Sequence, residues 1–202
     1  MAEIAVIGAG KIGGILARKW AASGHAVTIG ARDPNKPSLK ELAERIGVRT
    51  ALIVDAVRAA EVVVFAIPGV VMAETASALG ADLDGKLLID ATNNVGAETI
   101  NSQAAIRAAA PGASYFRAFN TLGWELFDRP TVGGVQADLF FCGPDGDDGV
   151  TAERLIADVG LRPVRVGGVE EVEVVDELLR VWFMLAVKQH RGRRLAFKLL
   201  ED

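Results

Sequence analysis

The fold is decided near the start of the chain, by the stretch Ile4-Ala5-Val6-Ile7-Gly8-Ala9-Gly10-Lys11-Ile12-Gly13. Its first part is an apolar run of strand length, and its second part spells G-x-G-x-x-G. From Lys11 to Ser23, apolar residues recur at helical spacing and stop before Gly24. The glycine pattern therefore lies at a predicted turn from a strand into a helix.

The three glycines of this turn have separate roles in a dinucleotide site. The first allows a tight turn, the second lets a pyrophosphate approach the backbone, and the third lets the helix pack closely on the strand. The free amides and positive end of the helix then face the phosphates. Glycine-rich turns are common, but a strand before, a helix after and a second strand predicted at residues 25–31 favour dinucleotide binding over an ordinary turn.

The end of the second strand indicates which dinucleotide binds. An NAD site places an Asp or Glu there to accept hydrogen bonds from the ribose. This chain has Ala31, which offers no acceptor, and then Arg32, whose planar fork of donors matches a phosphate. With Lys36 as a second cation, the sequence predicts NADP. The alternative is that Arg32 is a solvated charge and Asp33 binds the ribose.

Composition restricts the class of protein. A chain of 202 residues, 50% hydrophobic and 24% charged, can form one large domain or a domain with an appendage. The formal charge of −4 gives no basic face for nucleic acid. One cysteine, Cys142, excludes an intramolecular disulfide, and two histidines disfavour a histidine metal site, so no metal is expected. We expect no signal peptide, no membrane partner and a cytoplasmic protein.

Alternating helices and strands follow along the chain. Further strands are predicted at residues 48–50, 61–67, 86–89, 115–119, 137–142 and 162–166. Further helices are predicted at residues 39–46, 54–60, 70–79, 99–110, 147–159, 172–187 and 195–200. The pattern predicts an α/β fold, a Rossmann-type, doubly wound, mostly parallel sheet with a small C-terminal helical appendage. Residues 1–167 would bind NADP; residues 168–202 would supply C-terminal helices, a cosubstrate pocket and a dimer contact.

Three strand ends carry further candidate residues. Ala66, Ile67 and Pro68 close a β-branched run, and proline directs the chain out of the sheet at the edge where such sheets bind ligands. Asn93 follows one later strand, and Asn120 with Thr121 follows the next. Side chains that donate and accept hydrogen bonds suit a nicotinamide amide or a heteroaromatic ring. Asn and Thr are also ordinary turn residues, so this assignment depends on both loops meeting at one edge.

Taken together, several segments resemble the NADP-dependent reductases of the deazaflavin coenzyme F-420 (F420 below), and the similarity extends over nearly the whole chain. They are residues 8–13, 30–32, 66–68, 90–94, 119–121, 142–143, 161–163 and 195–200. The resemblance implies that Ala9 to Ile12, including Gly10 and Lys11, bind the pyrophosphate, and that Arg32 and Lys36 bind the 2′-phosphate. It also implies that Pro68 and Val71 border the cofactor.

The activity implied by this resemblance is hydride transfer between NADP(H) and the deazaflavin, which needs stacked rings and little acid–base chemistry. We predict that Asn93, Asn120 and Thr121 orient the rings. Alternatives are an NADPH-dependent flavin or metal reductase using FMN or FAD, since metalloreductase cytosolic domains are also similar, and a small-substrate dehydrogenase. A non-catalytic NADP-sensing protein is a further alternative. The apolar stretch 172–187 predicts a homodimer contact.

Overall fold

A computed structural model describes residues 1–201 of the chain. The chain divides into two compact units, Met1–Tyr115 and Phe116–Asp202. The unit boundary therefore lies elsewhere than the predicted division at residue 167. That division concerned binding roles and stays a prediction, and its last residue, 202, lies outside the described residues. Each unit is described separately.

The first unit contains a parallel, doubly wound sheet. Its elements are β1 (Glu3–Ile7), α1 (Lys11–Ala22), β2 (Ala26–Ala31), α2 (Pro37–Ile46), β3 (Arg49–Leu52), α3 (Ile53–Ala59), β4 (Val62–Phe65), η1 (Gly69–Val71), α4 (Met72–Leu79), η2 (Gly80–Leu83), β5 (Leu87–Asp90) and α5 (Gln103–Ala109). The strand order is β3-β2-β1-β4-β5-β6, and β6 (Ser114–Arg117) crosses into the second unit. The predicted Rossmann-type fold is confirmed.

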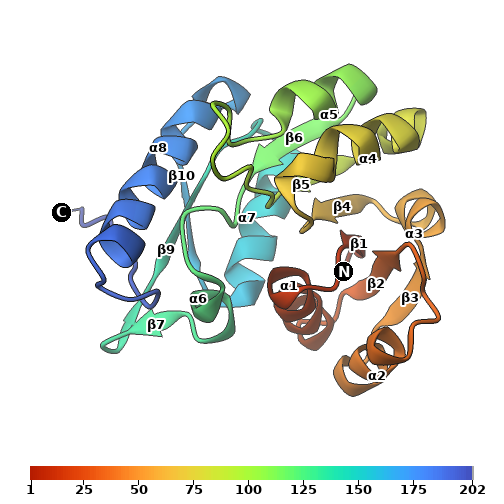
Figure 1. Cartoon of the computed structure of the whole chain (residues 1–202), viewed down its shortest axis with the longest axis horizontal. Coiled ribbons are helices and arrows are strands. Elements are labelled where there is room, and N and C mark those ends of the chain that lie inside the picture. Colours follow the sequence, from red (N-terminus) through yellow and green to blue (C-terminus); the bar gives the residue numbers. More distant parts are fainter. Residues whose placement is uncertain (202) are drawn as a thin grey trace. The chain divides into compact units, whose positions relative to one another are not determined.

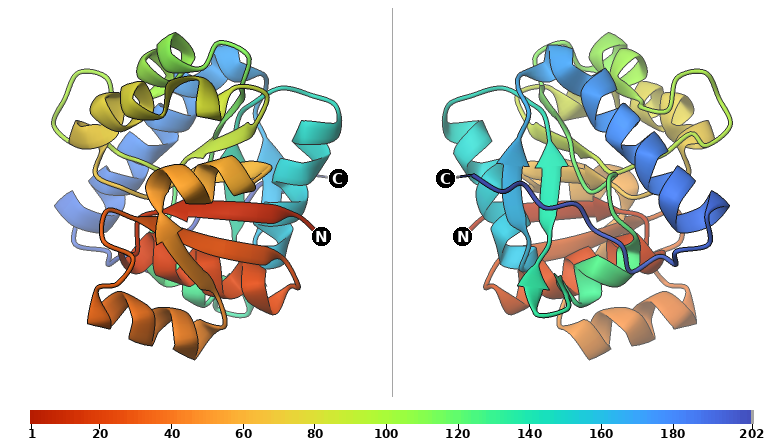
Figure 2. Two further views of the ribbon diagram at one scale, coloured as in Figure 1. Left: turned by 90° about the vertical axis from the view of Figure 1, so that its right-hand side faces the viewer. Right: turned by 90° about the vertical axis from the view of Figure 1, so that its left-hand side faces the viewer.

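The register and burial of the strands explain this arrangement. In β1, Val6 pairs in parallel with Ile29 on one side and with Val64 on the other. Every residue of β4 and β5 is buried, as expected for strands covered on both faces. Right-handed crossovers place α1 and α2 on one face of the sheet and α3, α4 and α5 on the other (Figures 1 and 2). The carboxyl ends of β1, β2, β4 and β5 therefore lie along one edge.

The second unit is built around a parallel strand pair. Its elements are α6 (Trp124–Asp128), β7 (Thr131–Val132), β8 (Val135–Gln136), β9 (Asp138–Phe141), α7 (Asp147–Val159), β10 (Arg162–Arg165), η3 (Val169–Glu171), α8 (Val172–Phe183) and the π-helical turn η4 (Met184–Lys188). Strands β9 and β10 pair in parallel, and β7 and β8 form a hairpin. A buried ion pair, 2.8 Å between Arg117 Nη2 and Asp176 Oδ1, joins the end of β6 to α8.

Three predicted elements were wrong in extent or kind. The helix predicted at 99–110 begins at Gln103, because residues 99–102 belong to a loop. Residues 195–200 form no helix; this segment is held instead by single contacts, among them the Trp182 Nε1–H that donates to the carbonyl of Leu195 at 2.9 Å. The α-helix predicted at 172–187 ends at Phe183 and continues as the π-helical turn η4, and two of its apolar residues, Val174 and Val181, are exposed.

Candidate dinucleotide site

The glycine turn between β1 and α1 has the geometry that a bound pyrophosphate requires. Gly8 adopts a φ of 110°, and a Cβ there would lie 2.5 Å from the carbonyl oxygen of Ala66. A Cβ at Gly13 would lie 2.0 Å from the carbonyl oxygen of Gly8, so only glycine allows α1 to approach β1. A Cβ at Gly10 would meet nothing within 4 Å. The second glycine thus faces open space, where a phosphate group could approach the backbone.

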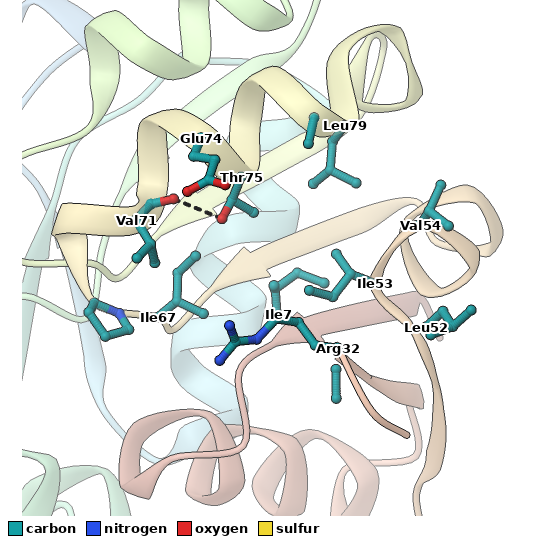
Figure 3. A pocket seen from close by; sticks show the side chains of 13 residues that line it. Ile7, Arg32, Leu52, Ile53, Val54, Ile67, Val71, Glu74, Thr75 and Leu79 are labelled. Carbon is teal, nitrogen blue, oxygen red and sulfur yellow. Dashed lines mark hydrogen bonds between the residues drawn. The ribbon is translucent and has the colours of Figure 1, made fainter. Parts of the chain in front are cut away.

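Two adjoining hollows lie at this edge of the sheet. The first, called the apolar hollow below, has a volume of about 600 Å³ and includes Leu52, Ile53, Ile67, Pro68, Val71 and Leu79 in its lining. The second, called the cationic hollow below, has a volume of about 570 Å³ and includes Gly8, Ala9, Asp33, Lys36 and Ser38. Arg32 lines both, and Figure 3 shows its side chain between Ile67 and Ile53.

Two cations are available for a ligand at the end of β2. Arg32 and Lys36 are exposed, and neither side chain has a hydrogen bond or ion pair within residues 1–201. Asp33 is the nearby carboxylate, and its Oδ1 accepts a hydrogen bond from the Asn35 N–H at 2.9 Å. That bond closes the turn between the two cations. A phosphate in the cationic hollow would therefore meet unpaired positive charge, as the NADP prediction requires.

The predicted cofactor residues distribute over this site as follows. Those that line a hollow are Gly8, Ala9, Ala31, Arg32, Lys36, Ile67, Pro68 and Val71. Those that form the turn or the first helical turn without lining a hollow are Gly10, Lys11, Ile12 and Gly13. Ala66 lines neither hollow, and its N–H donates to the Ile7 carbonyl at 2.9 Å. The residues present therefore fit the dinucleotide that the sequence predicts.

A buried carboxylate organises the loop that follows β5. Asp90 is fully buried and accepts hydrogen bonds from the N–H and hydroxyl of Thr92, at 2.9 and 2.6 Å, and from the Ser102 N–H at 2.9 Å. The hydroxyl of Tyr115 donates to it at 2.8 Å. The half-buried Asn93 lies in the loop that these bonds fix. The sequence shows one local sign of this network, an acidic residue that ends an apolar strand, but its partner Tyr115 lies 25 positions away.

The loops after β4 and β5 lie against each other. A Cβ at Gly69 would approach the backbone nitrogen of Asn94 to 2.7 Å, so the chain beyond Pro68 packs directly on the Asn94 backbone. Within the first unit, the loop that carries Asn93 therefore adjoins the apolar border of the dinucleotide site. The predicted meeting of the loops that carry Asn93 and Asn120 is a different contact, and it stays a prediction.

The remaining two predicted catalytic residues belong to the second unit and are deeply buried. Asn120 is 1% exposed and Thr121 0%. They follow Phe119, whose φ of 66° is rare for a residue with a side chain. Its ring meets Phe127 edge to face, with centroids 5.5 Å apart. Backbone strain of this kind is often found at functional sites, but the approach of these residues to Asn93 stays a prediction.

Other candidate chemistry is limited. Burial raises the pKa of the Cys142 thiol to about 12, so this side chain is not a nucleophile at neutral pH. Among residues 1–201, no three His, Cys, Asp or Glu side chains are grouped so that they could bind a metal ion. The described helices also include none that is long and apolar enough to cross a membrane.

Fold and glycine turn together define a dinucleotide-binding protein of the Rossmann class. Residues 3–94, which contain the glycine turn, the cationic strand end and the loops after β4 and β5, match the family described as NADP oxidoreductase, coenzyme F420-dependent. The chain is an NADP-dependent oxidoreductase that is similar to this family. The resemblance predicted from the sequence is thereby confirmed.

Individual relatives extend the match beyond residue 94. The chain is 29% identical to the F420-dependent NADP reductase of Methanothermobacter marburgensis, over 92% of this chain and 93% of that protein. The structure of a proposed F420-dependent NADP reductase from Arthrobacter sp. FB24 is 26% identical, with a TM-score of 0.85 and 100% of both chains covered. A reductive aminase of Aspergillus terreus, at 18% identity and a TM-score of 0.68, shares the fold alone, over 92% of this chain and 62% of that one. The cofactors that the family names imply are NADP and F420, as predicted.

Proposed function

We propose that the protein transfers a hydride between NADP(H) and the deazaflavin coenzyme F420. NADP(H) as the hydride donor is supported above all by one observation. The side chains of two cations, Arg32 and Lys36, are unpaired and lie beside a glycine turn that is open at Gly10. F420 as the hydride acceptor is supported by the similarity to the F420-dependent NADP reductase of Methanothermobacter marburgensis over nearly the full chain.

The reaction is balanced without a metal or an acid–base pair from the protein. NADPH supplies a hydride from nicotinamide C4 to deazaflavin C5, and with one proton from water the products are NADP⁺ and the reduced coenzyme. The protein's task is then to hold two rings within reach. The turn at Gly10 and the cations fix the pyrophosphate and 2′-phosphate, while Pro68 and Val71 border the cofactor. Asn93, Asn120 and Thr121 orient the rings by hydrogen bonds to their amide and carbonyl groups.

The experiment follows the absorbance of both cofactors in a mixture of purified protein, NADPH and oxidised F420, with NADH, FMN and FAD in separate arms. We expect loss of deazaflavin absorbance with NADPH and little with NADH. Reduction in the flavin arms alone would overturn the proposed acceptor in favour of a flavin reductase. NADP binding without turnover in any arm would overturn the proposed reaction and favour another substrate or a sensing role.

Variants separate donor binding from ring orientation. Arg32→Ala should lower NADPH affinity about 20-fold, because a charge-assisted hydrogen bond is lost, with little effect on NADH. Asn120→Ala should lower turnover and leave NADPH affinity nearly unchanged. Lys40→Ala removes a neighbouring exposed cation that lines neither hollow and is the matched control. Unchanged turnover in Asn120→Ala would remove Asn120 from the site.

We also propose that the enzyme is a homodimer formed through α8. Val174 and Val181 lie one heptad apart on this helix and are 43% and 46% exposed, which is unusual for large apolar residues on one helical face. Light scattering coupled to size-exclusion chromatography should give a dimer, and Val181→Glu should shift it towards the monomer. A monomer in the unmodified protein would contradict the proposal.

A further inference from the structure

The cationic hollow contains a hydroxyl group to which the proposed function assigns no role. Ser38 lines this hollow together with Arg32 and Lys36, and it is the one hydroxyl-bearing residue among the described residues of the lining. Its side chain is exposed and has no hydrogen bond within residues 1–201. Ala31, at the end of β2, carries no donor. A phosphate bound in this hollow would therefore accept a hydroxyl hydrogen bond from a residue of α2 and not from one of β2.

The beginning of α2 is also built in a way that suits an anion. Its N-cap residue is Lys36, which has no side-chain acceptor for the free amides, and its first turn holds no acidic residue. Helix N-termini usually carry Ser, Thr, Asp or Asn at the cap, and a cation there opposes the helix dipole. An anion bound between Lys36, Arg32 and Ser38 would remove this conflict.

The backbone leaves one amide of this turn free. Pro37, at the first helical position, has no N–H, and the amides of Leu39 and Lys40 donate to the Lys36 carbonyl at 2.9 and 3.1 Å. The Ser38 N–H has no partner within residues 1–201. Ser38 therefore presents two donors, its N–H and its hydroxyl, on the residue that lines the same hollow as both cations.

We propose that Ser38 binds the 2′-phosphate of NADP(H) together with Arg32 and Lys36 and is a specificity-determining residue of the enzyme. This inference rests on NADP(H) as the donor of the proposed function and is independent of the acceptor. Two cations neutralise the phosphate charge, and the Ser38 donors fix its orientation at the start of α2. NADH lacks the group that these donors recognise, so Ser38 contributes to NADPH binding alone.

The test measures binding of two nucleotide fragments to the full-length protein by calorimetry: 2′,5′-ADP, which carries the 2′-phosphate, and 5′-AMP, which does not. Ser38→Ala should weaken 2′,5′-ADP binding about fivefold and leave 5′-AMP binding unchanged, as expected for the loss of one hydroxyl donor. Ser38→Thr keeps the hydroxyl and should restore most of the affinity. Ser77→Ala is the matched control, because Ser77 is an exposed helical serine outside both hollows.

A charge-reversal variant separates recognition from helix stability. Ser38→Asp places a carboxylate in the first turn of α2, which favours the helix, but it should abolish 2′,5′-ADP binding by repelling the phosphate. The proposal is overturned if Ser38→Ala weakens both fragments equally or neither. It is also overturned if the unmodified protein does not prefer 2′,5′-ADP. If Ser38 governs this preference and yet no hydride reaches F420, the proposed acceptor fails while the role of Ser38 stands.

Discussion

The ends of strands β2 and β5 lie along the same edge of one sheet but use charge in opposite ways. After β2, Arg32 and Lys36 are exposed, and their side chains have no partners in the described part of the chain. After β5, Asp90 is completely buried and accepts four hydrogen bonds of 2.6 to 2.9 Å. The Asp90 carboxylate is used by the protein to hold its own loop, whereas the two cations are available to bind a ligand. Mutations at the two ends should therefore affect different measurements.

The largest effect is expected at the glycine turn between β1 and α1. In Gly13→Ala, the added Cβ would lie 2.0 Å from the Gly8 carbonyl oxygen, so α1 must move away from β1. We expect NADPH affinity, measured by fluorescence titration, to fall by more than about 100-fold, corresponding to a few kcal/mol of strain.

The adjacent glycine provides a control for this change. In Gly14→Ala, the Cβ would meet Leu42 Cδ2 at 3.6 Å, an ordinary contact, and alanine favours the helix. This variant should bind NADPH normally and unfold at a slightly higher temperature. Equal losses in both variants would mean that helix α1 tolerates no change at all, and the close-packing argument for Gly13 would fail.

Local sequence patterns predict the glycine turn, strand β4 and the end of β2, because each of these signals spans only a few positions. Three such signals are the glycine spacing, the β-branched strand of residues 62–65, and Arg32 after a small residue. Each can be recognised from a few neighbouring positions. The network around Asp90 depends on Tyr115, 25 positions away, and could not be read from local pattern. Likewise, residues 195–200 are apolar at helical spacing but are held by distant donors and acceptors. Their conformation is set by tertiary contacts, which periodicity does not contain.

The two strand ends can be distinguished by measuring both stability and NADPH binding in variants of Asp90 and Arg32. Asp90→Ala leaves several buried donors without an acceptor and should lower the free energy of unfolding by about 3 kcal/mol. Arg32→Ala removes an exposed side chain without partners and should change it by less than about 0.5 kcal/mol. Urea unfolding measures both.

For NADPH affinity, we expect the larger loss in Arg32→Ala and the smaller loss in Asp90→Ala. Arg32→Ala loses affinity although it is stable, and Asp90→Ala, assayed well below its unfolding transition, keeps most of its affinity for the 2′-phosphate fragment. Tyr115→Phe, which removes a single donor to Asp90, should cost about 1 kcal/mol and leave the loop in place. If Arg32→Ala destabilised the protein as much as Asp90→Ala, the distinction between charges reserved for a ligand and charges used by the fold would be wrong.

A second buried carboxylate, Asp138 in the second unit, accepts hydrogen bonds from charged donors. Burial alone would raise its pKa, but hydrogen bonds from Arg162, Lys198 and the Leu199 N–H outweigh burial and lower the pKa from 3.8 to about 2. Because the folded-state pKa is the lower one, the stabilisation is complete above about pH 5 and is lost as the pH falls from 3.8 through 2. The shift corresponds to about 2 kcal/mol.

This stabilisation can be isolated by comparing the unmodified protein with Asp138→Asn, whose amide does not titrate. The difference in unfolding free energy between the two should shrink by about 2 kcal/mol between pH 6 and pH 2. Because Lys198 and Leu199 lie in the C-terminal segment, that segment should become accessible to an acid-active protease over the same pH range. A difference that stays constant with pH would mean that the ion pairs of Asp138 add nothing beyond neutral hydrogen bonds.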